Sequence, residues 1–518
     1  MAQTSPRPAP SPWLWIALGV FVISALAAIG WVRAVWPFSE KSLTAAIEQA
    51  TGGRVEWHNF RSTYFPPGAT AERVKLFRTD RQPDPLIQVD RMILRGSFAG
   101  MWNSPKHIAE LQLRGFHLLA EQGAKAAVPS SPSHSTSSVV IDKVVADDST
   151  LRFVQRKAGK PPFELAVWHL VLHNVDNRLQ PLDFQAVLAI SEPPGEIHAS
   201  GRIGPWNSDD FATTPARGNY SLDGARLDVF KGLSGTLNSK GAFDGNLGTL
   251  HAAGDVNIPD FHLTQSHHTV PLSSHYEAMV DTLDGDVTLT SVATHVLHTT
   301  VMSRGSVSRE PTPHHGKTVD LQASVQGGRI NDVMLVLIKS KVAPMTGSLQ
   351  VNTSIRLPPG PAPFLKRLSM AGDFHISGAE FTKEARRLTL DQLSASAAGR
   401  KVNSDAGPGT VLSNLHGHCV VKDGVATLSN VTFQIPGSSA GIRGTFDLIT
   451  QQLNFQGNLQ TEGELSDTQK GIKKIFVKVA VAIHKHRSPQ HLIPFKITGQ
   501  YGDPKFALND DPQTKKRQ

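Results

Sequence analysis

The chain has 518 residues, of which 39% are hydrophobic and 19% are charged, a balance typical of a folded protein rather than a disordered one. Its formal net charge is +8, but the basic residues are mostly dispersed and no nucleic-acid-binding motif accompanies them, so we expect no nucleic acid as a partner. The single cysteine, Cys419, excludes an intramolecular disulfide and a cysteine-based zinc cluster.

An uncharged apolar segment runs from Leu14 to Val32. At about 1.5 Å per helical residue, it covers roughly the 30 Å hydrocarbon thickness of a bilayer. The sequence therefore predicts a membrane anchor over 13–35, formed by Leu14, Ile16, Val20, Phe21, Ile23, Leu26 and Ile29. A cleaved signal peptide is the alternative, because Ala25 and Ala27 form a small-residue cleavage pattern. The positive charges on the two sides of the segment do not decide its orientation.

Two local signals follow the anchor. Ser39 is a helix-capping residue, and it precedes Leu43 and Ile47 at helical spacing, so we expect a short helix that Gly52 ends. The Ser/Pro-rich stretch 126–138 predicts a linker or long loop.

Most of the remaining chain shows the two-residue periodicity of half-buried strands. In 319–325 and 349–357, apolar residues alternate with polar ones, which favours an antiparallel meander with one solvent-exposed and one apolar face. At roughly 12 to 16 residues per strand and turn, the body would hold about 30 strands. Asp-Gly pairs at Asp223, Asp244, Asp284 and Asp423 predict turns, and the last would join Cys419–Lys422 to Val425–Asn430 as a hairpin.

Two helical patterns interrupt the strands. Ile330, Val333, Met334 and Leu337 form one short apolar stripe, and 470–486 forms a longer, basic amphipathic one. Lys473, Lys474 and Lys478 of the basic helix could contact lipid headgroups. Alternatively, this helix covers the apolar face of the sheet while its lysines remain solvated.

Several segments, taken in order, resemble the AsmA-like family. An N-terminal anchor and short helix precede Thr51-Gly52-Gly53-Arg54-Val55 and Tyr64-Phe65-Pro66-Pro67-Gly68, and a basic helix precedes 492–499 (LIPFKITG) and 503–506 (DPKF). The resemblance implies a bridge-like lipid-transfer protein related in architecture to TamB-type and chorein-type grooves. Family bridges are often much longer than this chain.

The resemblance implies a mainly β fold, in which a transmembrane helix is followed by an elongated, curled antiparallel groove with a few short helices. It divides the chain into a cytoplasmic tail (1–12), the anchor (13–35), an N-terminal AsmA-like region (36–125), the linker (126–138), a central β-groove (139–398), a loop (399–413), a C-terminal AsmA-like β region (414–508) and a polar tail (509–518). The expected lipid-groove residues are Val319, Leu321, Val325, Leu349, Val351 and Ile355. A closed sandwich core would produce the same alternation.

The expected function is non-enzymatic. The resemblance implies an inner-membrane protein with a periplasmic body that binds or conducts phospholipid and supports outer-membrane biogenesis, with other envelope proteins as further partners. A scaffold for outer-membrane protein assembly, acting through exposed strand edges, is the alternative.

The sequence contains no motif that indicates catalysis or a cofactor. No nucleophile elbow, zinc-protease helix, Walker loop or dinucleotide-binding glycine pattern is present. The histidines also lack carboxylates at zinc-enzyme spacing, so we expect no metal site, although His416 and His418 would share one face of a strand.

Overall fold

The computed structural model describes residues 36–508 except 52, 78–84, 102–105, 122–138, 155–162, 176–179, 192, 206, 208–210, 267, 310–315, 340, 383–410, 436–437, 462–491 and 502. The predicted anchor, linker and basic helix with its three lysines, both tails and residues 399–410 of the predicted loop lie outside the described residues. Within the described ranges, no helix has the length and apolar character needed to cross a membrane.

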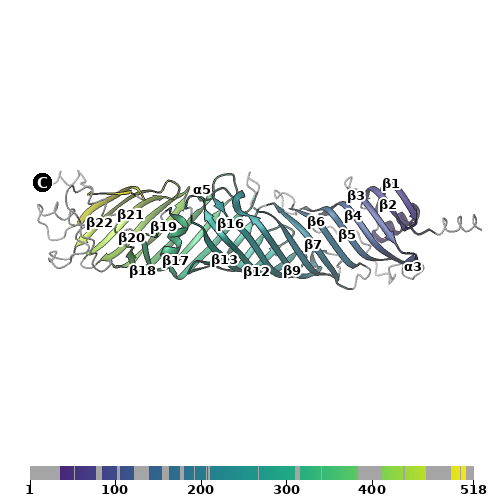
Figure 1. Ribbon diagram of the computed structural model, residues 1–518, viewed down its shortest axis with the longest axis horizontal. Helices are drawn as coiled ribbons and strands as arrows, with labels where there is room; N and C mark the ends of the chain where they lie inside the picture. Colours follow the sequence, from purple (N-terminus) through teal and green to yellow (C-terminus); the bar gives the residue numbers. More distant parts are fainter. Residues whose placement is uncertain are drawn as a thin grey trace, which may run out of the picture.

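The described chain is mainly β, as predicted, with few short helices (Figure 1). The helical elements are α2 (Glu40–Thr51), α3 (Phe98–Met101), η1 (Phe211–Thr213), η2 (Leu227–Val229), α4 (Ile330–Leu337) and α5 (Phe364–Arg367). The first twelve strands are β1 (Arg54–Tyr64), β2 (Pro67–Phe77), β3 (Ile87–Gly96), β4 (Lys106–Glu121), β5 (Val139–Val154), β6 (Phe163–Val175), β7 (Leu182–Ser191), β8 (Pro194–Ile203), β9 (Pro215–Arg226), β10 (Leu233–Ser234), β11 (Thr236–Asn246) and β12 (Thr249–Leu263). The others are β13 (Val270–Asp281), β14 (Val287–Val296), β15 (Thr299–Ser308), β16 (Thr318–Arg329), β17 (Met345–Leu357), β18 (Ser369–Phe381), β19 (Val411–Lys422), β20 (Val425–Ile435), β21 (Ser438–Asp447), β22 (Gln452–Thr461), β23 (Leu492–Gln500) and β24 (Asp503–Leu508).

The described residues form 24 strands in one sheet, against about 30 expected for the whole body, and β4 and β5 reach 16 residues each. Successive strands pair antiparallel, except that β9 pairs with β11 and the short β10 pairs with the end of β12. One pairing departs from the predicted meander: β4 and β5 are parallel neighbours. Parallel neighbours require the chain to return to the opposite end of the strands, and residues 122–138 make this connection. The sheet is continuous across the predicted linker.

The sheet curls into an elongated half-barrel with its strands tilted across the long axis (Figure 1). The predicted alternation is confirmed in β16 and β17, where Val319 faces Leu357, Leu321 faces Ile355, and Val325 faces Val351. Their polar neighbours lie on the other face, which carries cross-strand ion pairs such as Arg356 with Asp320 at 2.8 Å. On the apolar face, residues of strands far apart in the sheet, such as Phe261 and Val421, pack into one cluster, so this face is the concave one.

The Asp-Gly predictions are half confirmed. Asp423 and Gly424 both have positive φ in the predicted hairpin turn between β19 and β20, and Asp284 lies in the turn between β13 and β14. Asp244 stays paired within β11, so that prediction is wrong. Asp223 and Gly224 form a bulge in β9 rather than a turn, because the Gly224 N–H bonds to the Asn238 Oδ1 of β11 at 2.9 Å.

The predicted helix after Ser39 is α2, and the backbone N–H of Ser42 donates to Ser39 Oγ at its start. Leu43, together with Trp36 and Phe38, packs on the apolar face of β1–β4 against residues such as Ala69 and Met92. Phe38 approaches the sheet closely because Gly96 has no side chain; a Cβ there would lie 2.5 Å from Phe38 Cζ. The N-terminal end of the concave face is thus filled by the chain's own helix.

Candidate functional site: an apolar groove

One row of residues crosses the concave face in register and contains no charged side chain. Strand by strand from β4 to β23, the row consists of Leu113, Ala146, Leu170, Ala186, Ala199, Tyr220, Gly241, Gly254, Tyr276, Val292, Ser303, Ala323, Thr353, Gly372, Cys419, Leu428, Gly444, Phe455 and Ile497. Side chains that pair directly in a sheet share a face. An uncharged and largely apolar strip is therefore continuous from β4 to β23.

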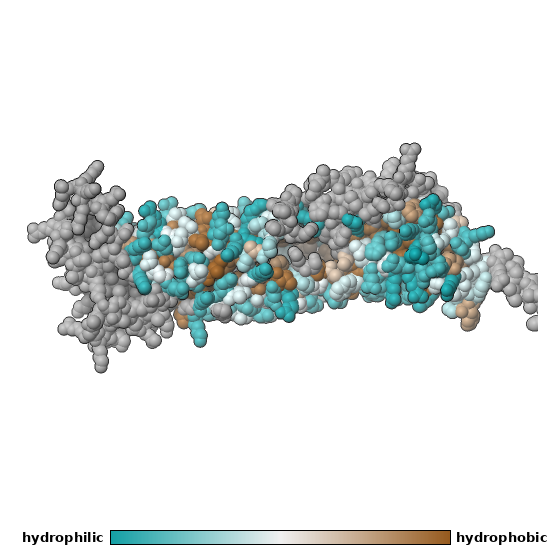
Figure 2. All heavy atoms as spheres, turned by 90° about the horizontal axis from the view of Figure 1, so that it is seen from above, coloured by the Kyte–Doolittle hydropathy of each residue, from teal (hydrophilic) through white to brown (hydrophobic). Residues whose placement is uncertain are grey.

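Two helices of the chain cover parts of this surface. Helix α2 covers β1–β4, and Ile330, Val333 and Met334 of α4 pack over residues of β17–β21. From β6 to β16, many large inward side chains are only half-buried, although others, such as Leu222, Ile258 and Val325, are buried. We call this section the central groove; its half-buried residues include Leu170, Phe184, Leu188, Ile197, Tyr220, Phe243, Val256, Leu272, Tyr276, Val292, Val301 and Leu321. Figure 2 shows apolar residues in an interrupted band along one face, between hydrophilic margins.

Glycines create space for aromatic rings on the floor of the central groove. Phe184 of β7 and Phe243 of β11 lie 6.4 Å apart between ring centroids, across Gly201 and Gly218 of the intervening strands. A Cβ on Gly218 would lie 2.9 Å from Phe243 Cζ. Aromatic rings that cover glycines shield backbone that would otherwise be solvated, and they add apolar area to the groove.

A second such pair carries the polar groups of the floor. Tyr220 and Tyr276 lie on either side of Gly241 and Gly254, and their hydroxyls hydrogen-bond to each other. Tyr220 also bonds to Ser239 Oγ at 3.2 Å. Burial, then the bond to Tyr220, raises the pKa of Tyr276, so its phenol remains protonated and uncharged. The groove floor therefore gains hydroxyl groups without a charge.

The two rims of the half-barrel meet across its mouth. The η2 rim contains the ends of β9, β12 and β16, whereas the α5 rim contains the ends of β17, β19 and β21. The backbone N–H of Phe364 donates to the Lys231 carbonyl at 2.6 Å, which joins α5 to the chain after η2. Below this bond, a shared apolar cluster unites both rims: Leu233, Phe261 and Leu263 from one, and Leu365, Val421, Ala426 and Leu448 from the other. We call this bridge the clasp.

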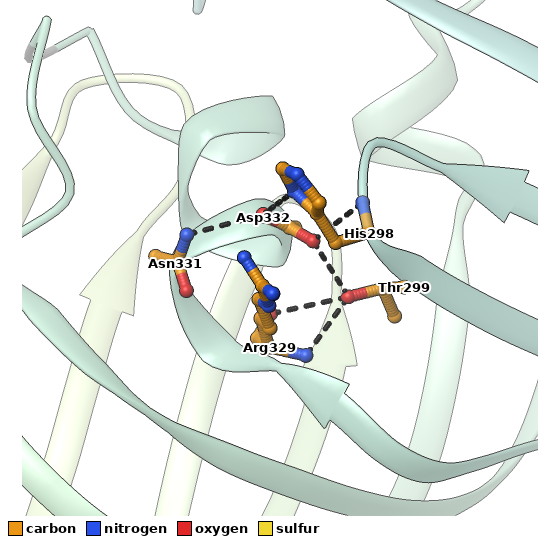
Figure 3. Close-up of polar contacts among 5 residues, drawn as sticks. All are labelled: His298, Thr299, Arg329, Asn331 and Asp332. Carbon is orange, nitrogen blue, oxygen red and sulfur yellow. Dashed lines mark hydrogen bonds and ion pairs between the residues drawn. The ribbon is translucent and has the colours of Figure 1, made fainter.

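Helix α4 is fixed to the η2 rim by a buried carboxylate (Figure 3). Asp332 is 2% exposed at its side chain, and its Oδ2 accepts the His298 backbone N–H and the Thr299 hydroxyl, each at 2.9 Å. Asn331 Nδ2 donates to the other oxygen at 3.1 Å. At the far end of α4, the Leu337 carbonyl accepts a bond from Gln451 of the α5 rim. Helix α4 therefore also extends across the mouth.

The six predicted groove residues all lie on the concave face, but in different surroundings. Val319, Leu321, Val351 and Ile355 are half-buried, whereas Val325 and Leu349 are buried, Leu349 beneath α4. Sequence analysis missed the aromatic residues Phe184, Tyr220, Phe243 and Tyr276. Alternation in their strands could have indicated a shared face, but the register that aligns them with glycines is not visible in the sequence.

The histidines lie largely in cross-strand pairs on the convex face. His416 and His418 share that face, as predicted; His418 Nδ1 lies 2.7 Å from Asp373 Oδ1, and His416 Nε2 lies 3.1 Å from the Thr432 hydroxyl. No group of three or more metal-binding side chains comes together among the residues that the structure describes. Burial raises the pKa of the Cys419 thiol on the concave face, which keeps it neutral.

Comparison with protein-family models, curated proteins and solved structures found no significant match. Membership of the AsmA-like family therefore stays a prediction.

Proposed function

We propose that this chain is a non-enzymatic, membrane-anchored envelope protein that binds phospholipid acyl chains in the central groove and conducts them along it. One observation carries the proposal: the uncharged concave row is continuous, yet its large side chains between β6 and β16 are only half-buried. Soluble proteins rarely leave a long contiguous apolar surface exposed to water, and such surfaces mark binding sites for apolar partners.

The chemistry of the groove suits a lipid. Each methylene moved from water to an apolar surface gains about 0.8 kcal/mol, so an acyl chain lying along the floor binds without specific polar contacts. Where the clasp and α4 do not bridge the mouth, a charged headgroup would stay in water, so its solvation would not be lost. At about 4.8 Å per strand, the ten strands from β6 to β16 other than the two-residue β10 span roughly 40 Å, which accommodates more than one acyl chain.

The proposed cellular location and role follow from the resemblance to the AsmA-like family. We place the anchor in the inner membrane and the body in the periplasm, with phospholipid movement toward the outer membrane as the role. Further envelope proteins would receive or supply lipid at the ends of the sheet.

The test uses two neighbouring residues that face opposite ways. Leu321 is half-buried on the concave face, and Gln322 is exposed on the convex face. A photoreactive benzoylphenylalanine at Leu321 should crosslink phospholipid in cells, whereas the same group at Gln322 should not. Lipid extraction and native mass spectrometry of the purified protein give the stoichiometry.

Equal crosslinking at both positions, or none at either, would overturn the proposal. Protein crosslinks at Leu321 to an outer-membrane barrel, with no lipid, would favour the scaffold alternative.

A further inference from the structure

We propose that an aromatic tip at the N-terminal end of the half-barrel, formed by Tyr64, Phe65 and Phe98, inserts into the interfacial layer of a phospholipid membrane. The inference rests on the proposed function in one respect, that 13–35 lies in that membrane. It adds a second contact between protein and bilayer, made by the folded body itself.

The tip consists of two short connections that lie side by side. Phe65 follows β1 in the turn to β2, and Phe98 begins α3 between β3 and β4; their rings lie 5.8 Å apart. Figure 1 shows β1, β2 and α3 at the same end of the elongated molecule. Two connections therefore present their aromatic rings together at one end of the sheet.

These rings are unusually exposed. Phe65 is 88% exposed, the highest value among the exposed large apolar side chains of the described ranges, and Phe98 and Tyr64 are 45% and 43% exposed. The other large apolar residues exposed along the sheet, such as Met279 and Met302, lie singly on strands. Single exposed apolar residues are ordinary, whereas a cluster of aromatic rings on a projecting tip indicates a partner.

The start of the described chain identifies that partner. Trp36 packs on Tyr64 with ring centroids 4.9 Å apart, and it lies only four residues after Val32, where the apolar segment 14–32 ends. If that segment spans a bilayer, the tip is held within a few residues of the bilayer surface. Tyrosine and tryptophan rings favour the headgroup level of a membrane, and phenylalanine side chains bury at the boundary between headgroups and acyl chains. A lipid surface, rather than a protein, is therefore the occupant that we assign.

The anchor and the tip together would fix the orientation of the folded body relative to the membrane. The anchor alone, joined through a short connection, would leave the body free to rotate. Because α2 fills the concave face over β1–β4, lipid would enter the groove beyond this end, on the side that the tip orients toward the bilayer. Orientation of the groove mouth is thus the function that we assign to the tip.

The experiment uses the full-length protein carrying Cys419→Ser, reconstituted in phosphatidylethanolamine and phosphatidylglycerol vesicles. Phe65→Cys is labelled with the environment-sensitive dye NBD, and lipids carrying a nitroxide at the headgroup or at acyl carbon five act as quenchers. The matched control is Met279→Cys, exposed on the convex face of β13. Phe98→Cys provides a second tip site in case one substitution disturbs folding.

We expect a blue-shifted emission and at least about threefold stronger quenching at both tip sites than at Met279→Cys. Quenching at the tip equal to that at the control would overturn the inference. The same samples in detergent, with trace nitroxide lipid, correct for lipid held in the groove. Lipid crosslinking at Leu321 tests the proposed function separately, because it does not depend on where the tip lies.

Discussion

The hydroxyls of Tyr220 and Tyr276 hydrogen-bond across two intervening strands, above the backbone of Gly241 and Gly254. The two tyrosines lie 56 residues apart in sequence, so only the strand register brings them together. This contact sets the shape of the groove floor and depends on the absence of side chains below it.

Gly254→Ala should displace this pair. The added Cβ would lie 2.6 Å from both Tyr220 Oη and the Lys240 carbonyl oxygen, and overpacking of this kind costs about 1–3 kcal/mol. We expect a lower midpoint of thermal unfolding and altered near-ultraviolet tyrosine dichroism. The control Ala242→Ser, at an exposed site on the adjacent strand, should change neither; an unchanged midpoint for Gly254→Ala would contradict the packing described.

Ile355→Asp and Leu349→Asp should behave differently although both lie on β17. Ile355 is half-buried and open to the groove, so its carboxylate can stay hydrated; lipid retention should fall while the protein remains folded. Leu349 is 3% exposed under α4, so a charge there should unfold this part of the sheet first. Lipid content by mass spectrometry and circular dichroism distinguish the two. Unfolding by both variants alike would indicate a closed core.

Asp332→Ala should release α4 from the rim. It leaves the His298 backbone N–H without its buried acceptor and leaves the Thr299 hydroxyl only its longer contact with the Arg329 carbonyl at 3.4 Å; an unsatisfied buried donor costs about 1–3 kcal/mol. Hydrogen exchange by mass spectrometry should show faster exchange in 330–337 and in the β14–β15 turn. Asn331→Ala, which removes only one donor to the same carboxylate, should have a smaller effect. Unchanged exchange after Asp332→Ala would show that apolar packing alone holds α4.

Because the clasp brings Gly232 close to Phe364, we predict that an engineered disulfide can form across the mouth. A Cβ on Gly232 would lie 3.8 Å from Phe364 Cβ, within the range of about 3.5–4.5 Å that disulfides use. In a Cys419→Ser background, Gly232→Cys with Phe364→Cys should crosslink under mild oxidation, detected as a reducible shift in gel mobility. Each single variant serves as a control. The positive φ of Gly232 makes the bond somewhat strained, but failure to form any crosslink would contradict the bridge between the rims.

Acid should loosen the η2 rim through Asp260. The pKa of this carboxyl lies below its usual value, chiefly because it accepts the Thr236 N–H at 2.7 Å. The folded pKa is depressed, so the stabilisation is fully present above about pH 4 and is lost as the pH falls through the folded value. Hydrogen exchange in 233–236, corrected for intrinsic rates, should rise over that interval. Asp260→Asn should abolish this dependence and Asp223→Asn should retain it; the reverse would exclude Asp260 as its source.

The local pattern of the sequence was sufficient to predict several strands, one helix and one turn. The alternation in 319–325 and 349–357 predicted β16 and β17 and the face that their apolar residues share, because strand side chains alternate with a period of two. The stripe from Ile330 to Leu337 predicted α4, and Asp423-Gly424 predicted its turn, because positive φ is a local property. Composition excluded a cysteine-based scaffold, whereas the two-residue alternation predicted a large sheet with one apolar face.

Tertiary structure decided how that face is used. Alternation cannot distinguish Ile355, which lines the groove, from Leu349, which lies under α4, because coverage depends on contacts between residues distant in sequence. The parallel pairing of β4 with β5, the glycine and aromatic register of the floor, and the bond between Lys231 and Phe364 are equally non-local. The sequence by itself determined that an apolar face exists; only the curvature of the sheet and the placement of α2, α4 and the clasp decided where that face is covered and where it is open.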